Sequence, residues 1–288
     1  MNWFLALNQE AFRAERYADM LKVAVHTALK NTSLVPHLLY DGRESLLTTW
    51  LRARGVRIIP CRSFAYDGLA SLSRERRDPN ILSIGAGAFL RVDLPSIARQ
   101  NGIRDEFILY TDVDVMFTTD VCAFLGTLKP QYFAAAPETD QNNPARMNSG
   151  VMVMNVDGLM NVDSDFKRFI ASHLHELIDQ NWDQGAYRRF FGRSNILTTV
   201  CGTRWDALPP EFNWKPYWGR NAGAAIIHFH GPKPHDRELL RSGTPADDAK
   251  WMVAFSGGAY DELTDLWREM LAQSAPIWHL HSRTFQDF

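Results

Sequence analysis

Short apolar segments alternate with segments of helical periodicity through the first 60 residues, and this alternation constrains the fold more than any other feature. Apolar runs of strand length cover residues 3–7, 35–40 and 56–60. Between them, apolar side chains recur every three or four positions over 14–30 and 46–51, as on one face of a helix. Strands separated by single helices are typical of βαβ units. The chain is therefore predicted to begin as an α/β domain with a largely parallel sheet.

The alternation continues further along the chain. A dense apolar run at 107–110 predicts a central strand buried on both faces, and a similar run covers 151–154. A short helix is predicted over 94–102, with a proline in its first turn and a glycine at its end. Residues 164–179 predict an amphipathic helix, and residues 224–229 predict a late strand.

The pattern becomes helical in the last part of the chain. One helix is predicted over 244–258 and a second around 260–270, where apolar residues share one helical face. We therefore expect residues 236–288 to form a helical C-terminal extension that packs on the preceding domain. The last third is also rich in tryptophan, which suits sugar stacking, an acceptor surface or the core.

Composition excludes several classes of protein. The 31 basic and 33 acidic residues give a net charge of −2, so no overall charge favours nucleic acid. The first apolar run, 3–7, is too short for a signal peptide or a membrane-spanning helix. The three cysteines are widely spaced and odd in number, which predicts free thiols in a reducing compartment. We expect a cytoplasmic protein with no transmembrane segment and no nucleic-acid partner.

Two carboxylates follow the most buried of the predicted strands. Asp112 and Asp114 are two residues apart, so an extended backbone places both on one face, about 7 Å apart. Ligands of open α/β sheets bind just beyond the carboxyl ends of the strands. Hard divalent cations take oxygen ligands and share their remaining positions with phosphates. The pair therefore predicts a site for a divalent cation.

A second Asp-x-Asp pattern, at Asp163 and Asp165, gives a comparison within the same chain. It comes immediately before a predicted helix, where aspartate and serine serve as N-caps. This local role explains the second pattern completely, so we interpret it as structural.

A third ligand is predicted from the segment 226–234. On a strand His228 and His230 face the same way, so either could complete the cation site. Lys233, held by neighbouring glycine and proline residues, would supply a positive charge for phosphate.

With these motifs placed, the chain resembles the family 8 glycosyltransferases, the group of glycogenin and of bacterial lipopolysaccharide galactosyl- and glucosyltransferases. The resemblance covers residues 1 to about 235. It is carried, in order, by residues 89–95, 109–116, 147–155, 183–184 and 228–234. It implies a GT-A fold over 1–235, that is, a Rossmann-like nucleotide-diphospho-sugar transferase with a mixed sheet flanked by helices.

The resemblance also implies an activity. Family members transfer a hexose from a nucleotide-sugar, usually a UDP-sugar, to a hydroxyl group with retention at the anomeric carbon. They use Mn²⁺ or Mg²⁺. The expected acceptor here is a glycan, glycolipid or protein, as in polysaccharide biosynthesis. If the acceptor is a lipid-linked glycan, the C-terminal segment could contact a membrane peripherally.

Carried over by position, the metal ligands would be Asp112, Asp114 and His228, with Asp112 also near the ribose or the sugar. Lys233 would grip the diphosphate, and Tyr110 and Gly231 would complete the donor-binding set. Ala6 and Asn8, at the end of the first strand, would read the uracil edge.

The remaining positions would surround the reacting sugar. Arg91 would contact the donor sugar or the diphosphate, and its apolar neighbours predict partial burial beside an anionic partner. Asn148 and Gly150 would line the sugar pocket. Asp183 and Gln184 would flank the reacting carbon, although Asp183 could instead cap a helix.

The sequence departs from the family pattern in three places. Asn8 stands where the family usually has aspartate, and Phe12 or Tyr17 would have to stack on the base. The loop from His228 to Lys233 is one residue shorter than usual, which keeps His230 as an alternative ligand. His235 stands where a tryptophan is common.

Several functions fit the residues. An amide such as that of Gln184 is a poor nucleophile, which favours front-face attack assisted by the departing phosphate. An inverting glycosyltransferase would use Asp183 or Glu138 as its base. A sugar nucleotidyltransferase usually has a glycine-rich loop after the first strand, and residues 8–16 contain no glycine. A catalytically silent nucleotide-sugar-binding protein would be favoured by loss of metal ligands, and all three candidates are present.

Overall fold

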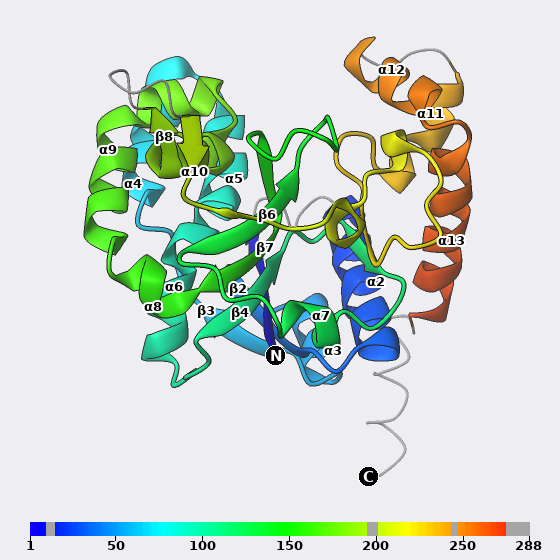
Figure 1. The fold of residues 1–288 in the computed structure, drawn as a ribbon, viewed down its shortest axis with the longest axis horizontal. Helices are drawn as coiled ribbons and strands as arrows, with labels where there is room; N and C mark the ends of the chain where they lie inside the picture. The colour runs from blue at the N-terminus through cyan, green and yellow to red at the C-terminus, as the bar shows by residue number, and fades with distance from the viewer. Residues whose placement is uncertain (10–14, 195–200, 243–246, 275–288) are drawn as a thin grey trace.

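A seven-stranded mixed sheet separates two layers of helices in the computed structural model, which describes residues 1–9, 15–194, 201–242 and 247–274 (Figure 1). The strand order is β10-β6-β7-β4-β1-β2-β3. Strand β1 pairs in parallel with β2 and β4, whereas β7 runs antiparallel to β4 and β6. The strands are β1 (Asn2–Asn8), β2 (Val35–Asp41), β3 (Arg57–Pro60), β4 (Phe107–Thr111), β6 (Phe133–Pro137), β7 (Met147–Asn155) and β10 (Asp206–Ala207).

The N-terminal βαβ units are confirmed. The predicted strands at 3–7, 35–40 and 56–60 correspond to β1, β2 and β3, which pair in parallel in that order. Helix α2 (Glu15–Asn31) connects the first two strands, and α3 (Leu46–Arg52) connects the next two. Ser45 and Thr48 close a capping box at the start of α3.

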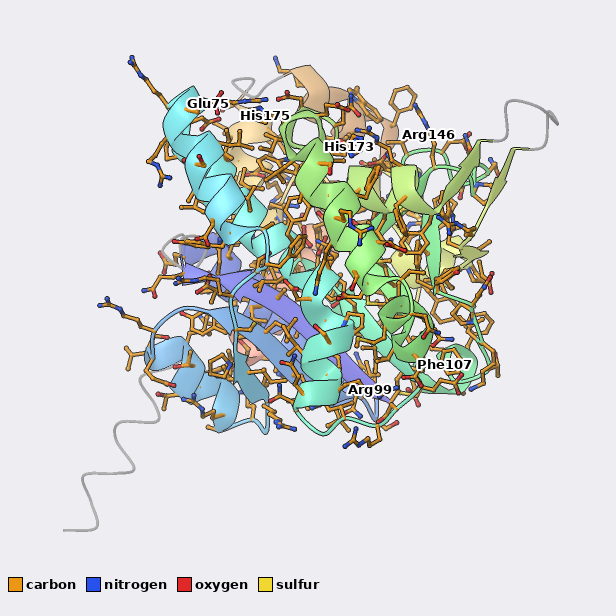
Figure 2. All side chains as sticks on the ribbon, turned by 90° about the vertical axis from the view of Figure 1, so that its left-hand side faces the viewer. Glu75, Arg99, Phe107, Arg146, His173 and His175 are labelled. Carbon is orange, nitrogen blue, oxygen red and sulfur yellow. The ribbon has the colours of Figure 1, made fainter. Side chains whose placement is uncertain are left out.

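Most of the remaining helices cover the opposite face of the sheet. They are α4 (Tyr66–Arg76), α5 (Pro79–Ala88), α6 (Leu90–Gln100), α8 (Val156–Met160), α9 (Asp163–Asp179) and α10 (Trp182–Phe191). Helices α4 and α9 lie side by side on this face, where Glu75 approaches His175 at 3.9 Å (Figure 2).

The predicted start of one helix is wrong. We expected a helix over 94–102 with Pro95 in its first turn, but α6 begins at Leu90 and Pro95 lies inside it. Proline removes one backbone donor from a helix, but this helix buries most of its residues against the core, and that burial outweighs one missing hydrogen bond.

Helices α5 and α6 follow each other so closely that together they form one helical segment, 79–100. By length and composition this segment could cross a membrane, but 67% of its most apolar 18-residue window is buried within the protein.

The second Asp-x-Asp pattern is structural, as predicted, but its aspartates are not caps. Val162 is the N-cap residue of α9, and Asp163 and Asp165 lie in its first turn. There they form ion pairs with Lys167 at 3.1 Å and Arg168 at 2.9 Å. Acidic side chains in a first turn also interact favourably with the helix dipole.

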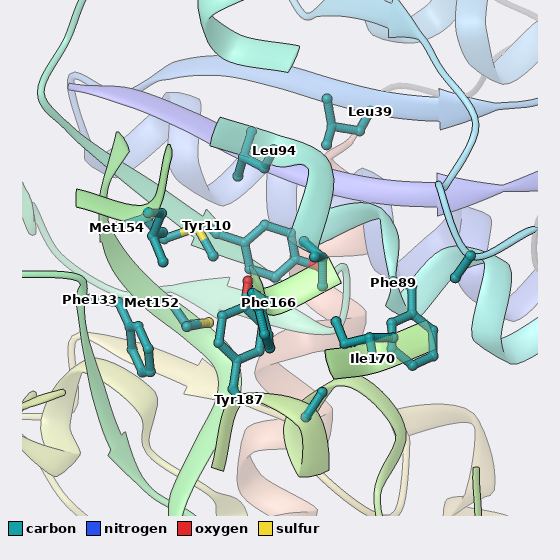
Figure 3. Packing of buried hydrophobic residues seen from close by; sticks show 14 of the residues in the cluster. Leu39, Phe89, Leu94, Tyr110, Phe133, Met152, Met154, Phe166, Ile170 and Tyr187 are labelled. Atoms are coloured by element: carbon teal, nitrogen blue, oxygen red, sulfur yellow. The ribbon is translucent and has the colours of Figure 1, made fainter. Parts of the chain in front are cut away.

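The core lies on both faces of the central strand β4, as its apolar sequence predicted. Ile108 and Tyr110 join the cluster beneath α9 and α10, whereas Leu109 belongs to the cluster on the opposite face. Figure 3 shows Tyr110 with Met152 of β7 and Tyr187 of α10 in this packing. Strand β4 is therefore packed on both faces, and this packing fixes the position of Asp112, which directly follows it.

A small second sheet places the late strand beside the end of β4. Strand β5 (Val115–Phe117) pairs antiparallel with β11 (Ile226–His228), which is shorter than the predicted strand over 224–229. His228 lies opposite Val115, and the Phe229 N–H donates to the carbonyl oxygen of Asp114 at 3.0 Å. This pairing joins two segments more than 100 residues apart in the sequence.

The C-terminal part is helical, as predicted. Helix α13 (Ala259–Gln273) lies along α2 (Figure 1), and Lys30 Nζ of α2 donates to Gln273 Oε1 at 3.0 Å. Helix α12 corresponds to the prediction over 244–258, although 244 and 245 lie outside the described residues, as does Trp278. The remaining elements are α7 (Cys122–Leu125), β8 (Gly192–Ser194), β9 (Cys201–Thr203), η1 (Pro210–Asn213), η2 (Pro216–Trp218), η3 (Pro234–Asp236), α11 (Arg237–Arg241) and α12 (Asp247–Phe255).

Candidate active site

Asp112, Asp114 and His228 form a compact group that could hold a metal ion. One ligand atom from each lies within 4.8 Å of the others. Asp112 directly follows β4, Asp114 directly precedes β5, and His228 ends β11. His228 Nε2 is 3.3 Å from Asp114 Oδ1 and 3.9 Å from Asp112 Oδ2. The two short strands thus gather the three ligand candidates that the sequence predicted.

Lys233 interacts with this group directly. Its ammonium forms an ion pair with Asp114 Oδ2 and donates to the carbonyl oxygen of Phe229 at 2.7 Å. Burial alone would raise the pKa of Asp114, but Lys233 and His228 together outweigh burial and hold that pKa well below its usual range. Asp114 Oδ1 is buried without a hydrogen-bond partner. Asp114 is therefore an ionised carboxylate with one oxygen left for a ligand.

His228 and His230 occupy different surroundings. His230 contacts the Tyr217 hydroxyl through Nδ1 at 3.0 Å, and its Nε2 is 4.0 Å from Glu138 Oε1. Burial lowers the pKa of His230 well below its usual value, which favours the neutral ring. Because the candidate metal group contains His228 and not His230, the geometry favours His228 as the third ligand.

Arg91 connects the metal group to the start of α10. Its side chain is 5% exposed, and Nη2 donates to Asp112 Oδ1 at 2.8 Å. Nη1 donates to the Ser149 carbonyl oxygen at 2.5 Å, and the guanidinium lies 4.6 Å from the centre of the Tyr110 ring. The Tyr110 hydroxyl also donates to Asp112 Oδ1, at 3.1 Å. The burial and anionic partner expected from the apolar neighbours of Arg91 are both present.

Asp183 faces Arg91 from the first turn of α10. Asn181 is the N-cap residue of this helix, so the alternative prediction that Asp183 is the cap is wrong. Asp183 Oδ2 lies 2.9 Å from Arg91 Nε without a hydrogen bond between them, because that N–H donates to Ala88 O. Burial raises the pKa of Asp183 to about 6 despite the neighbouring guanidinium.

Gln184 and Asn148 are joined in one hydrogen-bond network. Gln184 Oε1 accepts from Asn148 Nδ2 at 2.9 Å and from the Ser149 N–H at 3.0 Å. Gln184 Nε2 donates to Glu138, which also pairs with Arg188 at 2.7 Å. Both polar atoms of the Gln184 amide are therefore held by the protein.

Gly150 is required by the closeness of its neighbours. A Cβ at this position would lie 2.2 Å from His228 Cε1 and 2.9 Å from Asn148 Oδ1. The backbone of β7 thus passes directly beneath the imidazole ring, and any side chain there would displace it. Gly231 has a different reason, since its φ of +85° lies in the left-handed region.

A cleft of about 470 Å³ opens in front of the metal group. It extends from the carboxylates past Arg91 and Gly87 to Ala6 and Asn8 at the end of β1. Tyr17 also lines it, whereas Phe12 lies outside the described residues. A larger cavity of about 790 Å³ shares Asn8 and Ser83 with this cleft, and neither Asp112 nor Asp114 lines it.

Sequence reasoning missed four residues of the site, which are Asn213, Arg188, Ser149 and Tyr217. Asn213 contacts His228 and Asn148, and Arg188 anchors Glu138. The Ser149 carbonyl oxygen accepts from Arg91, and the Ser149 N–H donates to Gln184. The Tyr217 hydroxyl contacts His230. The one available signal was an asparagine between two aromatic residues, at Phe212-Asn213-Trp214.

A mixed seven-stranded sheet flanked by helices is the GT-A fold, which this chain shares with solved glycosyltransferases. The chain belongs to glycosyl transferase family 8, whose sequence pattern matches residues 13–237. No curated protein sequence matches the chain.

Solved structures of glycosyltransferases share this fold at low sequence identity. The galactosyltransferase LgtC, in complex with donor and acceptor sugar analogs, is 17% identical with a TM-score of 0.58; the match covers 90% of this chain and 96% of that one. The glycosyltransferase GlyE of Streptococcus pneumoniae is 14% identical with a TM-score of 0.56, covering 93% and 63%. Mouse xyloside xylosyltransferase 1 is 14% identical with a TM-score of 0.52, covering 80% and 98%.

Proposed function

We propose that this protein transfers a hexose from a UDP-sugar to a hydroxyl group of a glycan, glycolipid or protein acceptor. The transfer uses Mn²⁺ or Mg²⁺ and retains the anomeric configuration, and we place it in the cytoplasm. The observation that carries the proposal is that Asp112 and Asp114, grouped with His228, line a cleft that Asn8 also lines. A nucleotide at Asn8 would direct its diphosphate towards the carboxylates.

The residues present fit a hard divalent cation. Asp114 Oδ1 is buried without a partner, and it faces Asp112 and an imidazole nitrogen within 4.8 Å. Two carboxylates and one imidazole suit Mn²⁺ or Mg²⁺ with positions left for phosphate oxygens. When bound, such a cation would supply positive charge to the leaving diphosphate.

Lys233 would supply a second positive charge at the same place. Its ammonium already lies at Asp114, beside the carbonyl oxygen of Phe229. A diphosphate bound in the cleft offers it further anionic oxygens without a large movement. A fixed charge of this kind stabilises the negative charge that develops on the leaving group.

The contacts of three residues support retention by front-face attack. Both hydrogen bonds to Gln184 Oε1 withdraw this oxygen from the anomeric carbon. Glu138 is paired with Arg188 and Gln184, so it is a poor general base for an inverting reaction. Asp183, close to Arg91, would orient sugar hydroxyls beneath the reacting carbon.

Calorimetric titration with UDP tests the proposal, in Mn²⁺ and in EDTA, on the wild type and on Asp114→Ala. We expect binding to the wild type only with Mn²⁺, and a loss of at least about 100-fold in Asp114→Ala, because a metal ligand is removed. Asp165→Ala, in the other Asp-x-Asp pattern, is the matched control and should bind as the wild type does. Metal-independent UDP binding, or equal binding by Asp114→Ala, would overturn the proposal.

The donor is then identified by slow hydrolysis of a panel of UDP-sugars. The anomer released or transferred, read by NMR before mutarotation, distinguishes retention from inversion. A β-configured product from an α-linked donor would remove the retaining part of the proposal and leave the metal site intact.

A further inference from the structure

We propose that Asn213 is a positioning residue that fixes His228 in the tautomer whose Nε2 lone pair faces Asp112 and Asp114. The proposal rests on the metal site proposed above, and it adds a residue that is not itself a metal ligand. Asn213 is fully buried in η1 and contacts no group of the cleft itself. Its two amide atoms lie between Asn148 and His228.

The argument begins at two backbone N–H groups, whose direction is fixed. The Gly150 N–H donates to one side-chain atom of Asn148 at 3.1 Å, so that atom must be the oxygen, Oδ1. The Ser149 N–H donates in the same way to Gln184 Oε1, which therefore accepts from the nitrogen of Asn148. The orientation of the Asn148 amide is thus determined twice.

This orientation determines that of Asn213. The atom of Asn213 that lies 3.0 Å from Asn148 Oδ1 must be a donor, which makes it Nδ2. The remaining atom, Oδ1, is an acceptor and lies 2.9 Å from His228 Nδ1. His228 Nδ1 must therefore carry a hydrogen, and in the neutral ring Nε2 carries none.

The consequence appears at the carboxylates. In the neutral ring, Nε2 presents its lone pair to Asp114 Oδ1, which lies 3.3 Å away and is itself buried without a hydrogen-bond partner. Two acceptors that face each other at this distance in a buried site are stabilised by a cation between them. A ring nitrogen whose partner N–H is held by an acceptor is the common arrangement of a metal-ligating histidine.

Asn213 meets a requirement that few other side chains meet at this position. Leucine has a similar size but offers no acceptor to Nδ1–H. Aspartate offers an acceptor to His228 and none of the donors that Asn148 Oδ1 needs. The two substitutions therefore separate the control of the histidine tautomer from the link to Asn148 and Gln184.

Two measurements on the full chain test the proposal. The ¹⁵N shifts of the His228 ring in the metal-free protein, assigned with His228→Gln, report the tautomer directly. Binding of Mn²⁺ alone, followed by the loss of the free-ion EPR signal, reports the affinity. Asn161→Leu, at an exposed position after α8, is the matched control, and thermal unfolding confirms that each variant is folded.

We expect Nδ1–H in the wild type and a mixture of tautomers in Asn213→Leu, with Mn²⁺ affinity reduced about 10- to 100-fold. Asn213→Asp should keep the Nδ1–H tautomer and bind Mn²⁺ far more tightly than Asn213→Leu. A wild-type Nε2–H tautomer, or equal Mn²⁺ affinity in Asn213→Leu and the wild type, would overturn the proposal.

The two readouts also separate this proposal from the proposed function. If the wild type binds no Mn²⁺ but His228 has Nδ1–H only when Asn213 is present, the tautomer part stands and the metal function fails. If Mn²⁺ binds tightly while the tautomer does not depend on Asn213, the metal function stands and the positioning role is overturned.

Discussion

The positive charge of Arg91 balances the negative charges of two carboxylates in a buried place that water does not reach. It lies between Asp112 and Asp183, and both Arg91 and Asp183 are nearly fully buried. A buried charge without a partner is strongly destabilising, whereas this trio shares one positive charge between two negative ones. In the proposed function, the excess of negative charge in this trio would lie near the reacting carbon, where it suits an oxocarbenium-like transition state.

The raised pKa of Asp183 predicts a pH dependence of stability. Its pKa of about 6 exceeds the ordinary value of 3.8, so folding disfavours its charged form. The wild type should therefore lose stability relative to Asp183→Asn as pH rises from about 4 through 6, by about 3 kcal/mol in total. Below pH 4 the carboxyl is protonated in both the folded and unfolded states, and its contribution to the difference vanishes.

Urea denaturation at pH 4, 5, 6 and 7 measures this difference. The free energy of unfolding of Asp183→Asn minus that of the wild type should increase with pH and level off above about pH 7. Asp179→Asn, an exposed carboxylate paired with Arg76, is the control and should show no such increase. Parallel curves for Asp183→Asn and the wild type would contradict the predicted pKa.

Part of this site could be predicted from the amino-acid sequence. Asp112 and Asp114 were found because paired carboxylates after a buried strand have a local signature, whereas His228 was chosen over His230 by the family resemblance. Asn213 has none, since its partners Asn148 and His228 belong to segments joined only by the folded structure. Its role follows from hydrogen-bond directions, which a sequence does not contain.

At the scale of elements, the site depends on how closely three backbone segments approach one another. Strand β7 passes beneath the ring of His228 at Gly150, and β5 holds β11 by antiparallel pairing. The sequence predicted the late strand that contains β11, but it predicted neither β5 nor this pairing, because β5 and β11 have only three residues each. Three residues are the lower limit of usual strand length, so the local pattern of such a strand is too short to specify its partner.

The approach at Gly150 predicts a specific effect of one methyl group. Gly150→Ala places a Cβ 2.2 Å from His228 Cε1, and a buried strand cannot move away without disturbing β4 and β6. We expect a loss of about 1–3 kcal/mol in stability. Displacement of His228 should also weaken Mn²⁺ binding by at least about 10-fold.

Gly87→Ala is the matched control for this experiment. Gly87 lines the same cleft, but its added Cβ would meet Asn8 at 3.6 Å, which is an ordinary contact. Alanine in a helix is favoured over glycine, so this variant should keep or gain stability and bind Mn²⁺ as the wild type does. Undiminished Mn²⁺ binding by Gly150→Ala would show that His228 is not needed at its observed position.

At the scale of the whole molecule, the sheet order could be predicted only in part. The parallel order of β1, β2 and β3 follows from their connecting helices, and it was predicted. The antiparallel insertion of β7 between β4 and β6 was not, because its strand pattern contains no information on direction. The family resemblance supplied the mixed sheet that periodicity alone did not.

The C-terminal helix α13 predicts how the molecule unfolds. Its Trp267 and Met270 pack in one cluster with Met20 and Val23 of α2, and Thr27 of α2 accepts a hydrogen bond from the Phe117 N–H of β5 at 3.1 Å. Helix α13 is thereby connected, through α2, to the strand that positions His228. We expect Trp267→Ala to lower the stability of the whole chain by about 3–5 kcal/mol, with one cooperative transition.

Urea unfolding followed by both circular dichroism and tryptophan fluorescence tests this expectation, with Leu266→Ala on the exposed side of α13 as the control. Coincident transitions in both signals would mean that residues 236–288 and 1–235 unfold as one cooperative unit, although the sequence places a boundary between them. Separate transitions would mean that the extension unfolds on its own. In that case Trp267→Ala should leave Mn²⁺ binding unchanged, because β5 and β11 would keep His228 in place without α13.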